Sequence, residues 1–143
     1  MKFLPIGINL RGQKILIIGA GAAAAQKIRA LRKYTSALTL LAPEIKPVLR
    51  RSKYRKIIKP YAAADLTGYK LVYACTDDRR LNQQIARDAR RRRILVNVCD
   101  DPQHSDFISP AVYKKGFMSA AVFSDGRDVH KSLQWRDKIR SFL

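Results

Sequence analysis

Three groups of residues have types and spacing suited to chemistry on an anionic ligand. The first is the run Gly19-Ala20-Gly21-Ala22-Ala23-Ala24, which has the pattern G-x-G-x-x-A. Gly19 permits a tight turn, Gly21 lets a pyrophosphate approach the backbone, and Ala24 keeps a following helix close to a sheet. The N-terminus of that helix presents unpaired N–H groups to phosphate. The run predicts a dinucleotide-binding turn, and the alternative is a tight strand-to-helix turn without a ligand.

The other two groups are acidic and each follows a short apolar run. They are Thr76-Asp77-Asp78, and Asn97 with Asp100-Asp101. We expect Asp100 to be a functional residue. The alternatives stay open, because Asp77 or Asp78 could cap the following helix, and the later pair could be plain turn residues before Pro102.

Apolar runs and helical patterns alternate along the chain up to Asp100. The runs expected to form strands are residues 14–18, 37–41, 55–59, 71–75 and 94–99. The segments expected to form helices are residues 22–34, a short basic stretch that ends near Ser52, and residues 81–92. This alternation predicts an α/β fold with a Rossmann-type doubly wound parallel sheet. The three groups then share the edge at the carboxyl ends of the strands, with the glycine turn and Thr76 as neighbours.

The pattern changes after Asp100. The segments that follow are a polar loop, two apolar runs and a basic helical stretch, at residues 101–110, 111–113, 117–123 and 128–142. We therefore predict two parts, a dinucleotide-binding domain over residues 1–110 and a short C-terminal part over residues 111–143.

The charge of the chain is strongly positive. It has 29 Lys and Arg residues against 11 Asp and Glu residues, a formal net charge of +18. This excess favours nucleic acid, acidic lipid or a polyanionic small molecule without choosing among them, and a general bias in surface composition is the alternative. We rank nucleic acid last, because the sequence shows no aromatic stacking surface and no recognition-helix motif. No apolar run approaches the roughly 18 residues that span a bilayer, so we expect no membrane partner.

The two cysteines, Cys75 and Cys99, both lie inside apolar runs. Buried cysteines behave as small apolar residues, and nothing in the sequence indicates a disulfide framework. We therefore predict unpaired core thiols, a reducing compartment and a cytoplasmic location. No metal site is predicted.

The second strand lacks the acidic residue that usually holds the adenine ribose of NAD. Leu41-Ala42-Pro43 stands at its end, and Glu44 comes two residues late. Basic residues nearby, such as Lys46, are more typical of a solvated surface than of a site for the 2′-phosphate of NADP. The residues alone therefore leave the choice between NAD and NADP open.

Several motifs follow one another in order along the chain. They are Leu4-Pro5, Leu10-Arg11-Gly12, Gly19-Ala20-Gly21, Lys27, Ala42-Pro43-Glu44, Ala74-Cys75-Thr76-Asp77-Asp78, Asn82, residues 96–102, Asp106-Phe107-Ile108 and Pro110-Ala111. In this order they closely resemble the precorrin-2 dehydrogenase family, the NAD-dependent module of sirohaem synthase. The resemblance covers about residues 3–126. Its most specific parts are residues 97–102 and Asp106-Phe107-Ile108.

The resemblance implies a reaction and the residues that perform it. In that family precorrin-2 is oxidised to sirohydrochlorin with NAD⁺ as hydride acceptor, and some members then insert Fe²⁺ at the same site. The family's essential aspartate matches Asp100, which would take a proton or orient the macrocycle. The expected cofactor contacts are Gly19, Gly21, Ala22, Ala23, Pro43, Glu44 and Thr76. The expected substrate contacts are Asn97, His104 and Ser124.

The resemblance also implies partners. A polycarboxylate tetrapyrrole would account for the positive charge, because a positive field steers and holds an anionic substrate. Family members are homodimers that exchange elements after the Rossmann core. Residues 111–123 would supply that interface, which makes the C-terminal part a dimerisation strand and a terminal helix.

Three departures from the family pattern bear on substrate binding and iron chelation. Ala20 replaces a middle glycine that is common in the family. Ser124-Asp125-Gly126-Arg127-Asp128 keeps a serine and one glycine of the usual Ser-x-Gly-Gly-x-Ser-Pro and adds two acids. Many members continue into a C-terminal helical domain, whereas this sequence ends at Leu143. The alternative function is therefore a non-catalytic module that binds a dinucleotide or a tetrapyrrole.

Overall fold

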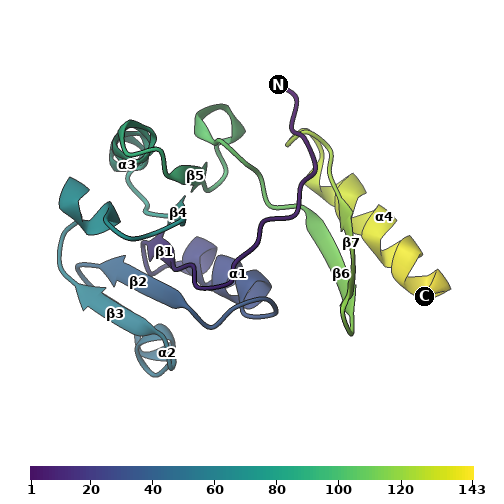
Figure 1. The fold of residues 1–143 in the computed structure, drawn as a ribbon, viewed down its shortest axis with the longest axis horizontal. Coiled ribbons are helices and arrows are strands. Elements are labelled where there is room, and N and C mark those ends of the chain that lie inside the picture. Colours follow the sequence, from purple (N-terminus) through teal and green to yellow (C-terminus); the bar gives the residue numbers. More distant parts are fainter. The chain divides into compact units, whose positions relative to one another are not determined.

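The computed structural model describes residues 1–143, and the expected α/β pattern is present (Figure 1). The elements are β1 Ile15–Ile18, α1 Ala22–Leu31, β2 Leu38–Ala42, α2 Pro47–Arg50, β3 Arg55–Ile58, η1 Ala63–Leu66, β4 Leu71–Ala74, α3 Arg79–Arg91, β5 Leu95–Val98, η2 Pro102–His104, β6 Ala111–Lys115, β7 Met118–Val122 and α4 Val129–Phe142. The chain forms two compact units. One is Ile8–Asp106, and the other combines Met1–Gly7 with Phe107–Leu143.

The unit Ile8–Asp106 is a five-stranded sheet in the order β3-β2-β1-β4-β5, with every neighbouring pair parallel. This order confirms the predicted doubly wound fold. All four residues of β1 are buried, because this central strand has helices over both faces and needs a continuous apolar sequence. Figure 1 shows α1 and α3 on opposite faces of the sheet.

The faces of β4 and β5 differ in character. The side chains on the α3 face join one core cluster with that helix: Val72, Ala74, Val96, Val98, Ile85, Ala86 and Ala89. Because side chains alternate along a strand, Tyr73 and Asn97 point to the opposite face, and the strand register pairs them. The sheet thus carries Tyr73 and Asn97 on the face that α1 covers.

Two aspartate side chains cap the starts of helices, and hydrophobic periodicity alone did not predict these starts. The Asp78 carboxylate accepts the backbone N–H groups of Arg80 and Leu81 at 2.8 and 3.1 Å, so α3 begins at Arg79, earlier than expected. This confirms the capping alternative for Asp78. The Asp65 carboxylate accepts the Ala62 N–H at 2.8 Å and starts η1, which the sequence did not predict.

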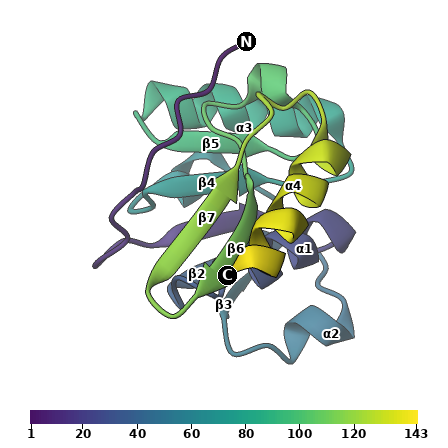
Figure 2. The same ribbon diagram turned by 90° about the vertical axis from the view of Figure 1, so that its right-hand side faces the viewer.

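The second unit is an antiparallel hairpin with one helix. β6 and β7 pair from Ala111 opposite Val122 to Lys115 opposite Met118. Figure 2 shows α4 running along this hairpin. The Phe3 N–H donates to the Asp125 carboxylate at 3.1 Å, so the N-terminal segment belongs to this unit, whereas the sequence grouped it with the dinucleotide-binding domain. No helix of the chain has the length and apolar character needed to cross a membrane.

Candidate functional site

The glycine turn joins the end of β1 to the start of α1. Gly19 has φ +116°, and its N–H donates to the Leu41 carbonyl at 2.8 Å. A Cβ at Gly19 would lie 2.2 Å from the Cys75 carbonyl oxygen, so no larger residue fits. The end of β1 therefore packs directly against the end of β4, as the topology predicted.

The N-terminus of α1 is open to an anion. Gly21 is the residue that precedes the helix, and no side chain caps the helix end. A Cβ at Gly21 would meet nothing within 4 Å, which leaves room for a ligand against the backbone. Ala24 is fully buried, so α1 packs closely against its neighbours, as expected of this position. Uncapped N–H groups, the helix dipole and this open space all fit a pyrophosphate.

The end of β2 lies beside this turn, because β1 and β2 are neighbours in the sheet. Pro43 and Glu44 follow the strand and are both exposed. Ala22 is exposed and Ala23 half-buried in the first turn of α1. The four residues stay predicted cofactor contacts.

The end of β4 is held by one amide side chain. The Thr76 N–H and hydroxyl donate to the Asn82 side-chain oxygen at 3.1 and 2.6 Å, and the Asn82 amide donates to the Thr76 carbonyl at 3.0 Å. Asn82 is buried in α3. The Thr76 side chain therefore builds the turn next to Gly19, and Asn82 is a supporting residue that the residue types alone did not reveal. Its signal was its place in the ordered motifs.

The end of β5 carries two acids with different surroundings. Asp100 is exposed and has φ +62°, a left-handed conformation that is uncommon for a residue with a side chain. Asp101 is partly buried, and its carboxylate lies 2.8 Å from His104 Nδ1. Burial by itself would raise the pKa of Asp101, but the hydrogen bond and charge of His104 outweigh it and lower the pKa below its ordinary value. His104, a predicted substrate contact, is thus a partner of Asp101.

The segment after Asp101 is tied back to β5. Ser105 Oγ accepts the Val98 N–H at 2.8 Å, and the Asp106 carboxylate accepts the Val96 N–H at 3.1 Å. Arg90 of α3 donates to Asp106 at 2.8 Å and to the His104 carbonyl at 2.7 Å. The acid of the Asp-Phe-Ile motif therefore fixes the turn that presents Asp100.

Lys27 adds a cation on the α1 side of the sheet. Its ammonium lies 5.8 Å from the centre of the Tyr73 ring. Burial lowers the pKa of Lys27, and the negative charge of Asp100 opposes that shift. The α1 helix thus contributes a partly buried positive charge that acts on Asp100. Residue types alone gave Lys27 no role.

Two predicted substrate contacts are not part of the strand-end turns. Asn97 is 4% exposed and lies inside β5, opposite Tyr73 and one residue before the strand ends at Val98. Ser124 belongs to the hairpin unit, where its Oγ accepts the Asp128 N–H at 3.1 Å ahead of α4. Within the sheet unit, the structure brings the glycine turn, Thr76 and Asp100 to one edge.

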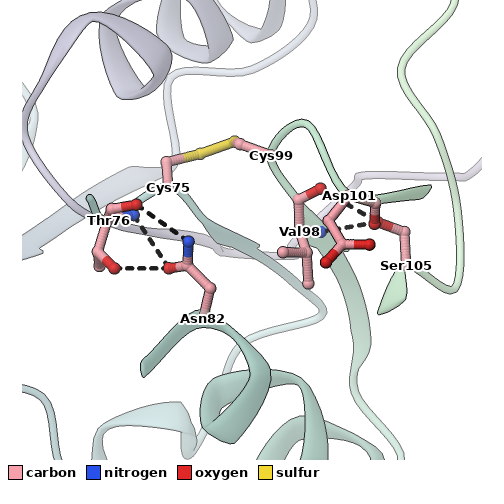
Figure 3. Close-up of a disulfide and its surroundings, with 7 residues drawn as sticks. All are labelled: Cys75, Thr76, Asn82, Val98, Cys99, Asp101 and Ser105. Atoms are coloured by element: carbon pink, nitrogen blue, oxygen red, sulfur yellow. Dashed lines mark hydrogen bonds between the residues drawn. A yellow bond between two sulfur atoms is a disulfide. The ribbon is translucent and has the colours of Figure 1, made fainter. Parts of the chain in front are cut away.

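The prediction of unpaired cysteines is wrong. Cys75 and Cys99 form a disulfide, with 5.2 Å between their Cα atoms (Figure 3). They follow Ala74 and Val98, which are partners in the β4–β5 register, so the two residues leave neighbouring strands side by side. Reading each cysteine within its own apolar run missed this, because the two are 24 positions apart in the sequence.

A family model described as "Putative NAD(P)-binding" matches residues 6–111. The chain belongs to this NAD(P)-binding family. The chain is also similar to siroheme synthases. That of Chromobacterium violaceum is 40% identical over 130 residues, which cover 88% of this chain and 28% of that protein. A siroheme synthase of Pseudomonas fluorescens is 40% identical over 147 residues, which cover 100% of this chain and 32% of that protein.

The chain therefore spans less than a third of the length of these two relatives. A solved structure named SirC, precorrin-2 dehydrogenase, superposes with a TM-score of 0.79 at 20% sequence identity, over 99% of this chain and 71% of that chain. At this identity the match establishes the fold. The relatives agree with the resemblance that the ordered motifs indicated.

Proposed function

We propose that this NAD(P)-binding chain oxidises precorrin-2 to sirohydrochlorin. The observation that carries the proposal is the placement of an anion-binding glycine turn and an exposed, left-handed Asp100 on one edge of the sheet. A non-glycine residue held in this backbone region is a common mark of a functional position. The siroheme synthase relatives and the fold shared with a precorrin-2 dehydrogenase support the same substrate.

The chain's own residues have distinct tasks in this reaction. A bound nicotinamide dinucleotide supplies the hydride acceptor. Asp100 takes the proton that leaves the tetrapyrrole as the hydride departs, because its carboxylate is exposed at the strand end. Lys27 contributes a partly buried positive charge that interacts with Asp100, and the net charge of +18 attracts the polycarboxylate substrate.

We assign NAD rather than NADP as the cofactor. Glu44 is an exposed acid two residues beyond β2, near where the adenine ribose lies in this fold. A carboxylate there accepts ribose hydroxyls and repels a 2′-phosphate. Glu44→Gln should therefore narrow the preference for NAD⁺ over NADP⁺.

The deciding experiment supplies the chain with NAD⁺ and enzymatically generated precorrin-2 and follows the absorbance of sirohydrochlorin. Asp100→Asn should lower kcat by about 100-fold or more, the usual contribution of a general base, while the dinucleotide Kd stays the same. Asp77→Asn is the matched control, because it removes an exposed carboxylate from the neighbouring turn. NADP⁺ is assayed in parallel.

Two results would overturn the proposal. One is equal turnover by wild type and Asp100→Asn. The other is tight dinucleotide binding with no turnover by wild type, which would favour the non-catalytic binding module instead. Adding Fe²⁺ to the sirohydrochlorin formed, with and without the protein, tests chelation as a separate step.

We also propose that the hairpin unit forms a homodimer. Phe117 at the hairpin turn is 93% exposed, and Trp135 of α4 is 55% exposed. An isolated two-stranded hairpin with one helix has little core of its own, and a second copy would cover these apolar side chains. Sedimentation should give twice the chain mass, and Phe117→Ser with Trp135→Ser should shift it to the monomer. A monomeric wild type would refute this arrangement.

A further inference from the structure

The Cys75–Cys99 disulfide lies between the two parts of the candidate site. Cys75 immediately precedes Thr76, and Cys99 immediately precedes Asp100. The Cys75 carbonyl is also the atom that a Cβ at Gly19 would strike at 2.2 Å. One covalent bond therefore connects the backbone that supports the glycine turn to the residue next to Asp100, as Figure 3 shows for the ends of β4 and β5.

The strand register keeps the two cysteines adjacent whether or not they are bonded. The Cys75 N–H donates to the Ile18 carbonyl at 2.8 Å, and the Cys99 N–H donates to the Ala74 carbonyl at 3.0 Å. These backbone bonds extend the sheet through both residues and do not involve sulfur. The thiols would thus stay close enough to pair again after reduction, without any unfolding.

The two sulfur positions differ in access. Cys75 is 4% exposed, whereas Cys99 is half-buried. An attacking thiolate needs access to one sulfur of a disulfide, and the more open one is Cys99. A disulfide with one sulfur open to small thiols exchanges with them while the chain stays folded.

We propose that Cys75 and Cys99 are a reversible thiol–disulfide pair that exchanges with low-molecular-weight thiols and sets the affinity of the glycine turn for its dinucleotide. The disulfide form binds more tightly. The closed bond adds a covalent cross-link between the ends of β4 and β5 to their backbone hydrogen bonds, so the Cys75 backbone beside Gly19 has less motion to lose on binding. This inference rests on dinucleotide binding and is independent of precorrin-2 oxidation.

The exchange is balanced with two thiol equivalents. A thiolate forms a bond to Cys99 Sγ, the Cys75–Cys99 bond breaks, and Cys75 leaves as a thiolate that takes up a proton. A second thiolate attacks the sulfur of the small molecule in this mixed disulfide, which forms the small-molecule disulfide and releases Cys99 as a thiolate that takes up a proton. Two electrons pass from the two small thiols to the cysteine pair.

The first test uses the wild-type chain in glutathione buffers of graded redox ratio. Alkylation with a maleimide followed by mass spectrometry measures the disulfide fraction, and titration with NAD⁺ measures Kd in the fully oxidised and fully reduced buffers. We expect the oxidised chain to bind NAD⁺ at least about fivefold more tightly, at the low end of typical coupling between sites. By linkage, saturating NAD⁺ should then shift the thiol–disulfide equilibrium toward the disulfide by the same factor.

Three results would overturn the inference. They are thiols that never pair in oxidised buffer, a disulfide that resists reduction while the chain is folded, and equal Kd values in the two states. Cys99→Ser is the matched control, because it should abolish any dependence of Kd on the buffer. If that variant folds poorly, the linked shift of the wild-type equilibrium by NAD⁺ still decides the question. Neither measurement involves turnover, so a failed precorrin-2 assay leaves this test intact.

Discussion

The turns at the ends of β4 and β5 are neighbours, and in both of them side chains hydrogen-bond to backbone groups at the strand end. The two turns use different side chains to do so. At the end of β4, one neutral amide, Asn82, satisfies the Thr76 N–H, hydroxyl and carbonyl. At the end of β5, two carboxylates and a hydroxyl share this role: Asp101 pairs with His104, Asp106 pairs with Arg90, and the Ser105 hydroxyl accepts the Val98 N–H. The first turn supports a backbone that faces the glycine turn. The second turn presents a carboxylate, Asp100, to the outside.

The comparison teaches that an acidic motif need not be the reacting group. Four acids lie in these two turns, and the structure gives two of them evident structural tasks, Asp78 as a helix cap and Asp101 as the partner of His104. Asp100 differs from both in its left-handed backbone, and it differs from Asp101 also in being exposed. Among the acids of these two turns, the carboxylate that we propose as functional, Asp100, is thus distinguished by its backbone.

Gly19→Ala should have the largest effect, because it breaks the contact between the glycine turn and the β4 end. The left-handed backbone alone should cost about 1–3 kcal/mol of unfolding free energy, and the Cys75 carbonyl must also move. Urea denaturation and NAD⁺ titration measure the two consequences. Gly21→Ala is the matched control, because its Cβ meets nothing within 4 Å and stability should stay within about 0.5 kcal/mol, while NAD⁺ binding weakens.

If Gly19→Ala instead retains both stability and NAD⁺ affinity, the β4 end does not support the glycine turn. Equal stability losses in Gly19→Ala and Gly21→Ala would indicate a general effect of replacing glycine in this turn. The contact with the Cys75 carbonyl would then not explain the loss.

Asn82→Ala and Ser105→Ala sharpen the comparison at intermediate size. Each removes the acceptor of one backbone N–H, that of Thr76 or that of Val98, which typically costs about 1–3 kcal/mol. Asn82→Ala should cost more, because three groups of Thr76 depend on it. It should raise the Kd for NAD⁺, whereas Ser105→Ala should lower kcat with little change in Kd. The reverse assignment would contradict the division of roles between the two turns.

The smallest expected effect concerns pH. The pKa of Asp101 is lowered in the folded state by the hydrogen bond and charge of His104. The carboxylate therefore contributes stability that is fully present above its ordinary pKa of 3.8 and is lost as the pH falls through the folded pKa. Near neutral pH, the free energy of unfolding of wild type, measured by urea denaturation, should exceed that of Asp101→Asn by at most about 1 kcal/mol, as expected for a partly exposed pair. The difference should vanish below the folded pKa. A difference that persists at the lowest pH at which the chain still folds would rule out the charge as its cause.

Much of the fold followed from short-range patterns. The apolar run at Lys14–Ile18 and the G-x-G-x-x-A turn fixed β1, α1 and their connection, because a strand buried on both faces leaves few alternatives. The start of α3 depended on the hydrogen bonds of Asp78, which periodicity does not contain. The Cys75–Cys99 bond depended on pairing β4 with β5 residue by residue. The support of Thr76 by Asn82 required both the strand end and the first turns of the helix in three dimensions.

The side chains of Ser105 and Asp106 have one more consequence, for how the sheet ends. β5 is the last strand, and its N–H groups at Val96 and Val98 point away from β4 to the carboxylate of Asp106 and the hydroxyl of Ser105. The Asp106 N–H also donates to the Val96 carbonyl at 2.8 Å. An open strand edge invites edge-to-edge aggregation with other chains, and these two side chains occupy the positions that an added strand would need. The turn that presents Asp100 is therefore also what closes this side of the sheet to further pairing.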